Sequence, residues 1–222
     1  MRIQLQNYRI ALLFIALQLI SSIASCQESK DPFSGLEDEK ILPMLKYLPL
    51  QYGGMNVPPS DGRLLYDLII DNGYKRGLEI GTSNGYSALW QGLAFQKNGG
   101  SMITLEIEKK RAKEAQGNFK SAGLDEVIES RVNDALKEIP KLDGQFDFVF
   151  IDAWKPDYMQ YLELIRDKMK PGGVITAHNV RNAGRDMQDF LDAIKTDPGL
   201  DTKIVNSSSS GVSVSFVKST KK

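Results

Sequence analysis

The chain has 222 residues, and its 28 basic residues balance 28 acidic ones, so its formal net charge is +0. Charged residues make up 25% and hydrophobic residues 41%, which is the balance of a globular protein and excludes a wholly disordered chain. A neutral surface gives no electrostatic reason to expect a nucleic acid as partner. The length suits one α/β domain with an N-terminal extension.

The first 26 residues have the pattern of an export signal. Arg2 and Arg9 precede an apolar run from Ile10 to Ile20, which is short for a membrane span and typical of a signal-peptide core. The run leads to "IASC", which resembles a bacterial lipoprotein signal in which Cys26 would carry the lipid. An ordinary secretory signal or an uncleaved anchor is the alternative. The basic residues before the run predict that the domain faces away from the cytoplasm.

We therefore expect an exported, lipid-anchored protein, or a cytoplasmic one if residues 1–26 are not a signal. Residues 27–40 are polar and acidic and predict a tether, and residues 41–222 predict the folded domain. Because Cys26 is the only cysteine, a lipidated Cys26 would leave the domain without a disulfide or a thiol nucleophile.

Strand and helix patterns alternate along the domain. Residues 58–73 predict a helix, with Ser60 or Asp61 as its N-cap and Gly73 as its stop. Strands are predicted, each followed by a turn or helix, at 76–80, 101–108, 127–134, 146–153 and 173–179. The helices between and after them are predicted at 86–95, 109–123, 157–173 and 185–199, and two final strands flank a Ser/Gly turn within 202–219.

This alternation predicts an α/β fold of Rossmann-like type. It would contain a doubly wound, mostly parallel seven-stranded sheet with helices on both faces and an antiparallel C-terminal hairpin. In such a sheet, ligands bind outside the carboxyl ends of the strands. Polar residues close five of the apolar strands, namely Glu79, Glu106, Asp134, Asp152, and His178 with Asn179.

The turn "EIGTSNGYS" carries Gly81 and Gly85, whose small size would let a ligand approach the backbone. Neither the dinucleotide fingerprint GxGxxG nor the P-loop lysine motif is present. Glu106 ends the next strand, about 20 residues on, where an acid can accept hydrogen bonds from ribose hydroxyls. A tight turn without function explains either glycine alone, but the turn together with the acid favours a nucleoside site.

Four segments, "MNVPPSDGRLLYDLI", "LEIGTSNGYSALW", "TLEIE" and "IDAWKPDYMQYLELI", resemble the class I S-adenosylmethionine-dependent O-methyltransferases, in the catechol and caffeoyl-CoA branch. The resemblance runs from about Met55 to the C-terminus. It implies that S-adenosylmethionine is the cofactor. The residues that it implies for cofactor binding are Met55, Val57, Glu79, Gly81, Ser83, Tyr86, Ser87, Glu106, Ile107, Asp134, Ala135, Asp152 and Trp154.

The same resemblance implies that Lys155 is the catalytic base. A hydroxyl is a poor nucleophile until it loses its proton, and a lysine with a lowered pKa can take that proton. Lys155 lies three positions after Asp152, so both could reach one pocket. A solvated surface lysine is the alternative, because that is where most lysines lie.

The resemblance further implies a divalent metal held by Asp152, His178 and Asn179. This family usually has an aspartate where the chain has His178, its only histidine. Imidazole suits Zn²⁺ or Mn²⁺ better than Mg²⁺, so the metal could be Mg²⁺, Mn²⁺ or Zn²⁺, or the site could bind none. His178 could instead be the base itself, or a histidine hydrogen-bonded at a strand end.

The function expected is transfer of a methyl group from S-adenosylmethionine to a hydroxyl of a small, aromatic, catechol-like acceptor. The partners would be that small molecule and, through the N-terminus alone, a membrane; no nucleic acid is expected, and the protein would be a monomer or a homodimer. The alternative is a lipid-anchored, non-catalytic module that binds a nucleoside on the same fold.

Overall fold

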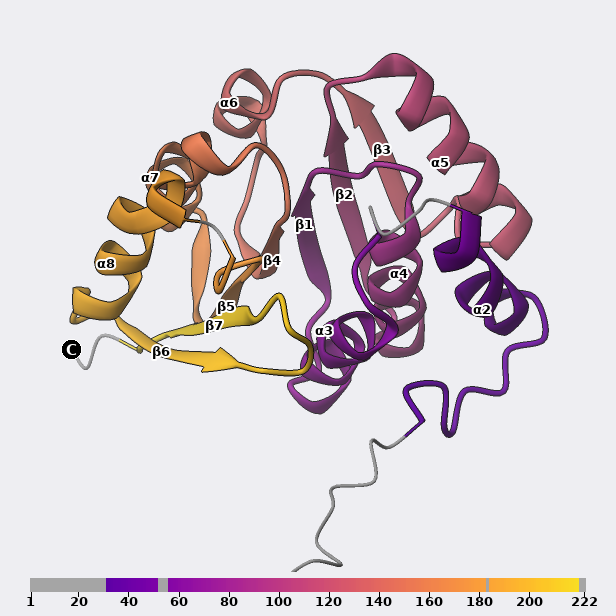
Figure 1. Cartoon of the computed structure of the whole chain (residues 1–222). Coiled ribbons are helices and arrows are strands. Elements are labelled where there is room, and N and C mark those ends of the chain that lie inside the picture. The colour runs from indigo at the N-terminus through magenta and orange to yellow at the C-terminus, as the bar shows by residue number, and fades with distance from the viewer. Residues whose placement is uncertain (1–30, 52–55, 183, 220–222) are drawn as a thin grey trace, which may run out of the picture. The chain divides into compact units, whose positions relative to one another are not determined.

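The computed structural model describes residues 31–51, 56–182 and 184–219, and Gly35–Lys222 form one compact unit (Figure 1). The predicted signal segment with Cys26, the start of the tether, and Met55 lie outside the described residues. In the described part of the chain, no helix has the length and apolar character that crossing a bilayer requires.

The strands are β1 (Arg76–Ile80), β2 (Ser101–Glu106), β3 (Ile128–Val132), β4 (Phe146–Ile151), β5 (Met169–His178), β6 (Leu200–Val205) and β7 (Val212–Val217). The α-helices are α2 (Ile41–Gln51), α3 (Pro59–Asp71), α4 (Tyr86–Asn98), α5 (Lys109–Ala122), α6 (Ala135–Glu138), α7 (Tyr158–Arg166) and α8 (Gln188–Thr196). Short 3₁₀ turns are η1 (Ile139–Lys141), η2 (Lys155–Asp157) and η3 (Gly184–Met187).

These strands form one seven-stranded sheet in the order β3-β2-β1-β4-β5-β7-β6. The pairs from β3 through β5 are parallel, and β7 is antiparallel to both β5 and β6. The predicted fold class is confirmed. The order reverses between β1 and β4, which is where a doubly wound sheet opens a crevice for a ligand.

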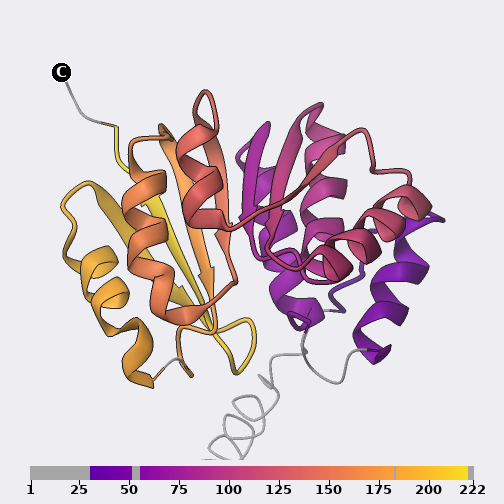
Figure 2. The same ribbon diagram turned by 90° about the horizontal axis from the view of Figure 1, so that it is seen from above.

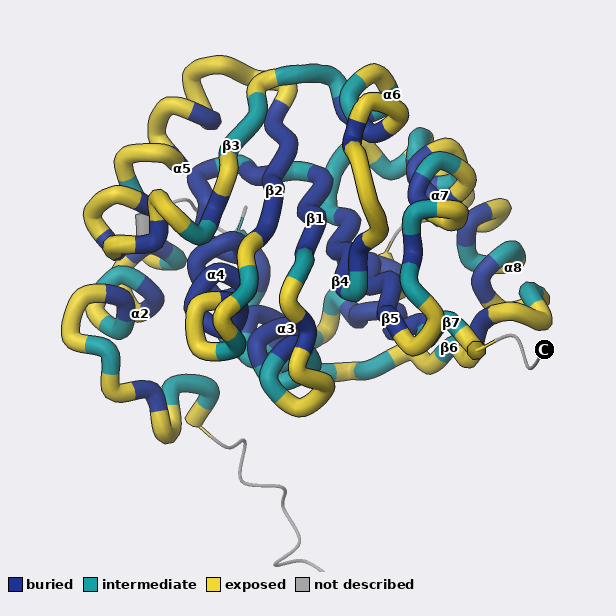
Figure 3. The backbone as a smooth tube through the Cα atoms, turned by 180° about the vertical axis from the view of Figure 1, so that it is seen from behind, coloured by how far each residue is buried: buried dark blue, intermediate teal, exposed yellow. Residues whose placement is uncertain are grey.

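Helices cover both faces of the sheet (Figures 1 and 2). On one face, Ile80, Val149 and Ile175 of the central strands pack in a core with Tyr161 of α7 and Phe190 of α8. On the opposite face, the rings of Phe148 in β4 and Phe95 in α4 pack in a T-shaped, edge-to-face arrangement. The central strands and most of α4 are buried, whereas α5 exposes one side to solvent (Figure 3). Strands buried on both faces explain the nearly continuous apolar runs in the sequence.

Three local features differ from the sequence prediction. Helix α2, which the sequence did not predict, contains two prolines: Pro43 lies in its first turn, where proline is tolerated, and Pro49 lies inside the helix toward its C-terminal end. Helix α3 begins at Pro59 with Pro58 as N-cap, so neither Ser60 nor Asp61 caps it. Helix α7 ends at Arg166, and β5 begins at Met169 rather than at residue 173, with an irregular register beside β4.

Candidate functional site

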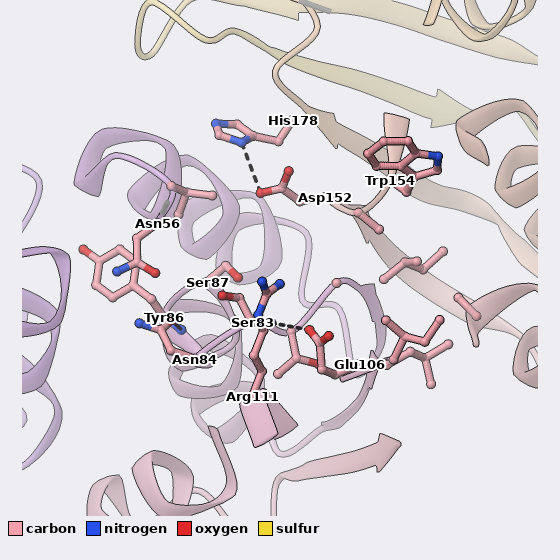
Figure 4. Close-up of a pocket in the computed structure, with 18 of the residues that line it drawn as sticks. Asn56, Ser83, Asn84, Tyr86, Ser87, Glu106, Arg111, Asp152, Trp154 and His178 are labelled. Atoms are coloured by element: carbon pink, nitrogen blue, oxygen red, sulfur yellow. Dashed lines mark hydrogen bonds and ion pairs between the residues drawn. The ribbon is translucent and has the colours of Figure 1, made fainter. Parts of the chain in front are cut away.

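A cavity of about 850 Å³ opens at the carboxyl ends of β1, β2, β4 and β5, a size typical of small-ligand sites. Most residues that the sequence assigned to a site line it. They are Val57, Gly81, Ser83, Tyr86, Ser87, Glu106, Ile107, Asp134, Ala135, Asp152, Trp154, His178 and Asn179. Figure 4 shows several of these side chains around the cavity, with Glu106 at one end and His178 with Asp152 at the other.

Gly81 lets three strand ends converge under the cavity. Its φ is +101°, and a Cβ atom there would lie 2.2 Å from the backbone oxygen of Asp152. The Gly81 amide also donates to the Leu105 carbonyl at 2.9 Å. A larger residue would push β1 and β4 apart, so glycine is required by both the backbone angle and the space.

Glu106 is held at the mouth of β2 by two backbone amides. Its carboxylate accepts hydrogen bonds from Ser83 N at 2.8 Å and from Glu108 N at 2.9 Å. The first of these bonds is drawn in Figure 4. Ser83 has a left-handed φ of 50°, which turns its amide toward the carboxylate. The acid is therefore fixed in orientation and lies in the cavity wall.

Glu79 lies behind the wall rather than in it. It is fully buried and accepts hydrogen bonds from Ser87 Oγ at 2.7 Å, Gln91 Nε2 at 2.6 Å and Thr104 Oγ1 at 2.5 Å. Burial raises the pKa of Glu79 to about 7, although these hydrogen bonds act in the opposite direction. The structure thus places Glu79 as a support for Ser87, which does line the cavity.

Asn84 is a cavity residue that the sequence did not single out. Its Oδ1 accepts a hydrogen bond from Tyr86 N at 3.1 Å. Its Nδ2 is buried and has no hydrogen-bond partner among the described residues. A buried donor without a partner in the wall of a cavity is available to a ligand. The only sequence signal was its place in the Gly-bearing turn.

At the other end of the cavity, His178 lies between two aspartates. Its Nδ1 is 3.2 Å from Asp152 Oδ2, and its Nε2 is 2.9 Å from Asp61 Oδ2. His178 is 4% exposed and Asp61 is 1% exposed, so this contact is shielded from water. Figure 4 shows the bond between His178 and Asp152.

The two carboxylates make His178 a cation at neutral pH. Burial lowers the pKa of His178, but hydrogen bonding to Asp152 and Asp61 outweighs it and raises the pKa to about 9. Burial raises the pKa of Asp152, but His178 and the charge of Lys155 hold it below the ordinary 3.8. Burial also raises the pKa of Asp61, but hydrogen bonds from His178, Ser207 and Ser208 outweigh it and hold the pKa below 3.8. A buried charge is tolerated when it is paired in this way.

Asp61 was expected only as a possible helix cap, and its contact with His178 was not predicted. Ser207 Oγ donates to its Oδ1 at 2.5 Å, and Ser208 Oγ donates to its Oδ2 at 2.6 Å. These serines lie in the loop between β6 and β7, so the C-terminal hairpin holds a residue of α3. An acid in the first turn of a helix was the one sequence signal for Asp61.

Lys155 turns toward Asp152 and lies outside the residues that line the cavity. Its Nζ donates to Asp152 Oδ1 at 3.0 Å, to Tyr158 OH at 2.8 Å and to the Ala153 carbonyl at 3.4 Å. An ammonium has three N–H donors, and all three are used here. To become a base, the ammonium would have to give up one of these three hydrogen bonds together with its proton.

The cavity rim carries two large apolar side chains that are open to solvent. Trp154 is 69% exposed and Ile107 is 72% exposed, and both line the cavity. Trp154 faces the cavity from the side of Asp152 (Figure 4). Exposed apolar groups on a cavity wall gain stability when a flat ligand covers them.

The predicted metal site does not fit the donors present. Among the described residues, no group of three or more His, Cys, Asp or Glu side chains is arranged to hold a metal ion. Both nitrogens of His178 are directed at carboxylates, and Asp152 already faces Lys155 and His178. Asn179, with a φ of 61°, ends the strand beside them.

The comparisons with known sequences agree with this geometry. A family model described as O-methyltransferase matches residues 37–197. A catechol O-methyltransferase of Niastella koreensis is 36% identical over 173 residues, which is 75% of each chain. A catechol O-methyltransferase of Mycobacterium tuberculosis is 37% identical over 122 residues, 54% of each chain, so the match spans about half the length of that relative.

Solved structures share the fold. An O-methyltransferase of Streptomyces achromogenes involved in tomaymycin synthesis, in complex with SAM, has a TM-score of 0.73 and 27% identity over 84% of this chain and 94% of that one. An O-methyltransferase of Bacillus cereus in complex with SAH has a TM-score of 0.69 and 27% identity over 89% and 96%. This chain belongs to the O-methyltransferase family.

Proposed function

We propose that the protein transfers a methyl group from S-adenosylmethionine to a hydroxyl of a small aromatic acceptor. The observation that carries the proposal is the cavity itself, which joins the fixed carboxylate of Glu106 at one end to Asp152 and His178 at the other. The end at Glu106 suits a nucleoside, and the end at Asp152 and His178 suits a polar acceptor. Both ends belong to the same cavity.

The residues of the cavity fit S-adenosylmethionine. Glu106 would accept hydrogen bonds from the ribose, Gly81 leaves room along the backbone, and the free Nδ2 of Asn84 would donate to the polar end of the cofactor. Ile107 and Asp134 also line the cavity, and we expect the adenine to pack against them. When bound, the cofactor supplies a methyl group on a positively charged sulfur, and that sulfur leaves as a neutral thioether.

A flat acceptor fits the opposite end. Trp154 offers an exposed aromatic face on the wall, close to the polar groups of Asp152 and Asn179. This pairing of an aromatic surface with polar groups suits a hydroxylated ring. The names of the relatives support the same class, since two are catechol O-methyltransferases and one from Medicago sativa is a caffeoyl-CoA O-methyltransferase.

Lys155 is the proposed base. The carboxylate that it contacts, Asp152, lines the cavity, and the Lys155 side chain keeps 25% of its surface exposed. In this role Lys155 would act as a neutral amine that has given its extra proton to solvent, and Nζ would turn from Tyr158 toward the acceptor hydroxyl and take its proton. The charged state of His178 argues against the alternative that the histidine is the base.

Calorimetry with S-adenosylhomocysteine tests the cofactor half of the proposal. We expect Glu106→Gln to weaken binding by about tenfold, roughly 1.4 kcal/mol, because a carboxylate accepts ribose hydrogen bonds more strongly than an amide does. Glu114→Gln, an exposed position on α5, is the control. An affinity unchanged by Glu106→Gln contradicts the nucleoside assignment.

Turnover of a panel of catechols and flavonoids tests the chemical half. Lys155→Ala should lower kcat at least a hundredfold if the lysine takes the proton. A rate unchanged in Lys155→Ala removes that assignment. Binding of the cofactor without turnover of any acceptor would favour the non-catalytic nucleoside-binding module instead.

Export is a second proposal and rests on residues 1–26 alone. A signal of this kind would place the domain outside the cytoplasm, anchored through a lipid on Cys26. Mass spectrometry of the mature N-terminus tests it: a lipidated Cys26 supports the anchor, and an intact Met1 contradicts it.

A further inference from the structure

His178 is one of the residues that the sequence resemblance assigned to a metal site, but its surroundings suit a charged imidazole. A carboxylate can only accept hydrogen bonds, and a neutral imidazole has only one N–H to donate. Both ring nitrogens lie within hydrogen-bonding distance of a carboxylate oxygen, at 3.2 Å and 2.9 Å. The ring satisfies both contacts only when both nitrogens carry a proton.

The charges around the ring are already balanced. Asp61 and Asp152 supply two negative charges, and His178 and Lys155 supply two positive ones. A divalent ion at Asp152 would therefore bring two uncompensated charges next to the Lys155 ammonium, which is 3.0 Å from Asp152 Oδ1. In this arrangement, electrostatic repulsion opposes metal binding.

A metal-bound histidine would have a different partner pattern. Its ligating nitrogen would be unprotonated, and its other N–H would be oriented by a carboxylate, a role that Asp61 could play. The contacts of Asp152 do not match those of a metal ligand. One of its oxygens contacts the Lys155 ammonium, and the other contacts His178.

We propose that His178 is a built-in cation that takes the place of a divalent metal at the acceptor end of the cavity, with Asp61 as its positioning residue. The loop serines Ser207 and Ser208 fix Asp61, so the C-terminal hairpin completes the arrangement. The chemical purpose of this cation rests on the proposed methyl transfer, whereas its charge and its effect on metal binding are measurable without turnover.

The protonation of His178 is the most direct test. Because it is the only histidine in the chain, an untagged protein labelled with ¹⁵N gives imidazole signals from one residue. We expect long-range ¹H–¹⁵N spectra at pH 7, with and without S-adenosylhomocysteine, to show two protonated ring nitrogens. A ring with one bare nitrogen overturns the proposal.

Titration with Mn²⁺ on the same sample tests metal exclusion. One equivalent of Mn²⁺ should leave the His178 signals of the wild-type protein sharp, and selective broadening of these signals overturns the proposal. His178→Asp should bind Mn²⁺ at least tenfold more tightly than the wild type, because it replaces a cation with a third carboxylate beside Asp61 and Asp152. Equal affinity would mean that the histidine is not what excludes the ion, and this also overturns the proposal.

Two matched substitutions on α3 test the positioning role. Asp61→Asn should shift or remove the Nε2–H signal of His178, while Asp67→Asn, which changes a partly exposed carboxylate on the same helix that pairs with Arg63, should leave it unchanged. An unchanged signal in Asp61→Asn contradicts the role of Asp61. Activity supplies a separate readout: a metal chelator should not reduce turnover. If no acceptor is turned over, the proposed function fails while the spectra and the Mn²⁺ titration still decide this inference.

Discussion

Nε2 of His178 lies 2.9 Å from Oδ2 of Asp61, a residue 117 positions earlier in the chain. The contact joins the first turn of α3 to the end of β5, and two serines of the β6–β7 loop complete the shell around Asp61. The buried carboxylate of Asp61 on α3 therefore contacts both the end of β5 and the β6–β7 loop.

Loss of Asp61 should destabilise the protein strongly. Removing one partner of a buried ion pair leaves the other charge unpaired, which costs about 3–5 kcal/mol. We expect a loss of this size for Asp61→Ala in urea unfolding at pH 7. Asp67→Ala removes a partly exposed carboxylate of the same helix, together with its ion pair to Arg63, and should change stability by about 0.5 kcal/mol. Equal effects of the two substitutions would argue against a buried pair.

In the β6–β7 loop, Ser207 and Ser208 should contribute to the stability of the protein, and Ser209 should not. Ser207→Ala and Ser208→Ala each remove a hydrogen bond to a buried carboxylate, which is worth about 1.5–3 kcal/mol. Ser209 is exposed, so Ser209→Ala should be close to neutral. Chemical denaturation of the three variants measures this order. If Ser209→Ala costs as much as Ser208→Ala, the stability comes from the loop backbone instead.

The sheet and the cavity wall could be predicted because their signals are local. Apolar runs such as "FDFVFI" mark strands buried on both faces, and the polar residue after each run marks the ligand edge. Glu106 and Asp152 were found in this way. Helix α2 was missed because it contains two prolines. Pro43 lies in its first turn, where proline is tolerated, but Pro49 lies inside the helix, where proline is ordinarily unfavourable.

The partners of His178 could not be predicted, because pairing across 117 positions leaves no local pattern. Asp61 carried the signal of a helix cap, but the Pro58-Pro59 pair starts the helix two residues earlier and turns Asp61 into the interior. The orientation of the Lys155 side chain could not be predicted either. Its spacing from Asp152 brings the two residues together, but the contact with Tyr158, which turns the lysine away from the cavity, is seen only in the structure.

Substitution of Gly81 should remove cofactor binding. Gly81→Ala would place a methyl group 2.2 Å from the Asp152 carbonyl oxygen at a φ of +101°, which costs at least about 2 kcal/mol. It would also separate the ends of β1 and β4 under the cavity. We expect calorimetry to show no binding of S-adenosylhomocysteine to this variant.

The matched control for this substitution is Gly117→Ala on α5. A Cβ atom there has no neighbour within 4 Å among the described residues, and alanine favours a helix by about 0.5–1 kcal/mol. This control should bind the cofactor normally and unfold at slightly higher urea. Normal binding by Gly81→Ala would mean that the strand ends can separate without disturbing the cavity.

The charge of His178 should make stability fall at alkaline pH. Its pKa is about 9 in the folded protein and 6.5 ordinarily, so its contribution is complete below pH 6.5 and is lost as pH rises through 9. The difference corresponds to about 3 kcal/mol. The charged groups that face the ring are Asp61, Asp152 and, through Asp152, Lys155. Both aspartates have a pKa below 3.8 and do not titrate in this window.

Glu79 affects the stability of the protein over a different pH range. Its pKa is raised from 4.5 to about 7, so its contribution is lost between these values and has ended before most of the His178 change begins. Urea unfolding at pH 7.5 and pH 10 therefore avoids the Glu79 window. Four buried tyrosines, Tyr74, Tyr86, Tyr158 and Tyr161, have a raised pKa and also lower stability toward pH 10, so it is the difference between wild type and His178→Asn that isolates the histidine. Wild-type stability should drop over this interval, and His178→Asn should show a much smaller drop, because it has no proton to lose. A wild-type profile as flat as that of His178→Asn would mean that His178 is neutral in the folded protein, and a neutral ring could not be the cation that stands in for a metal.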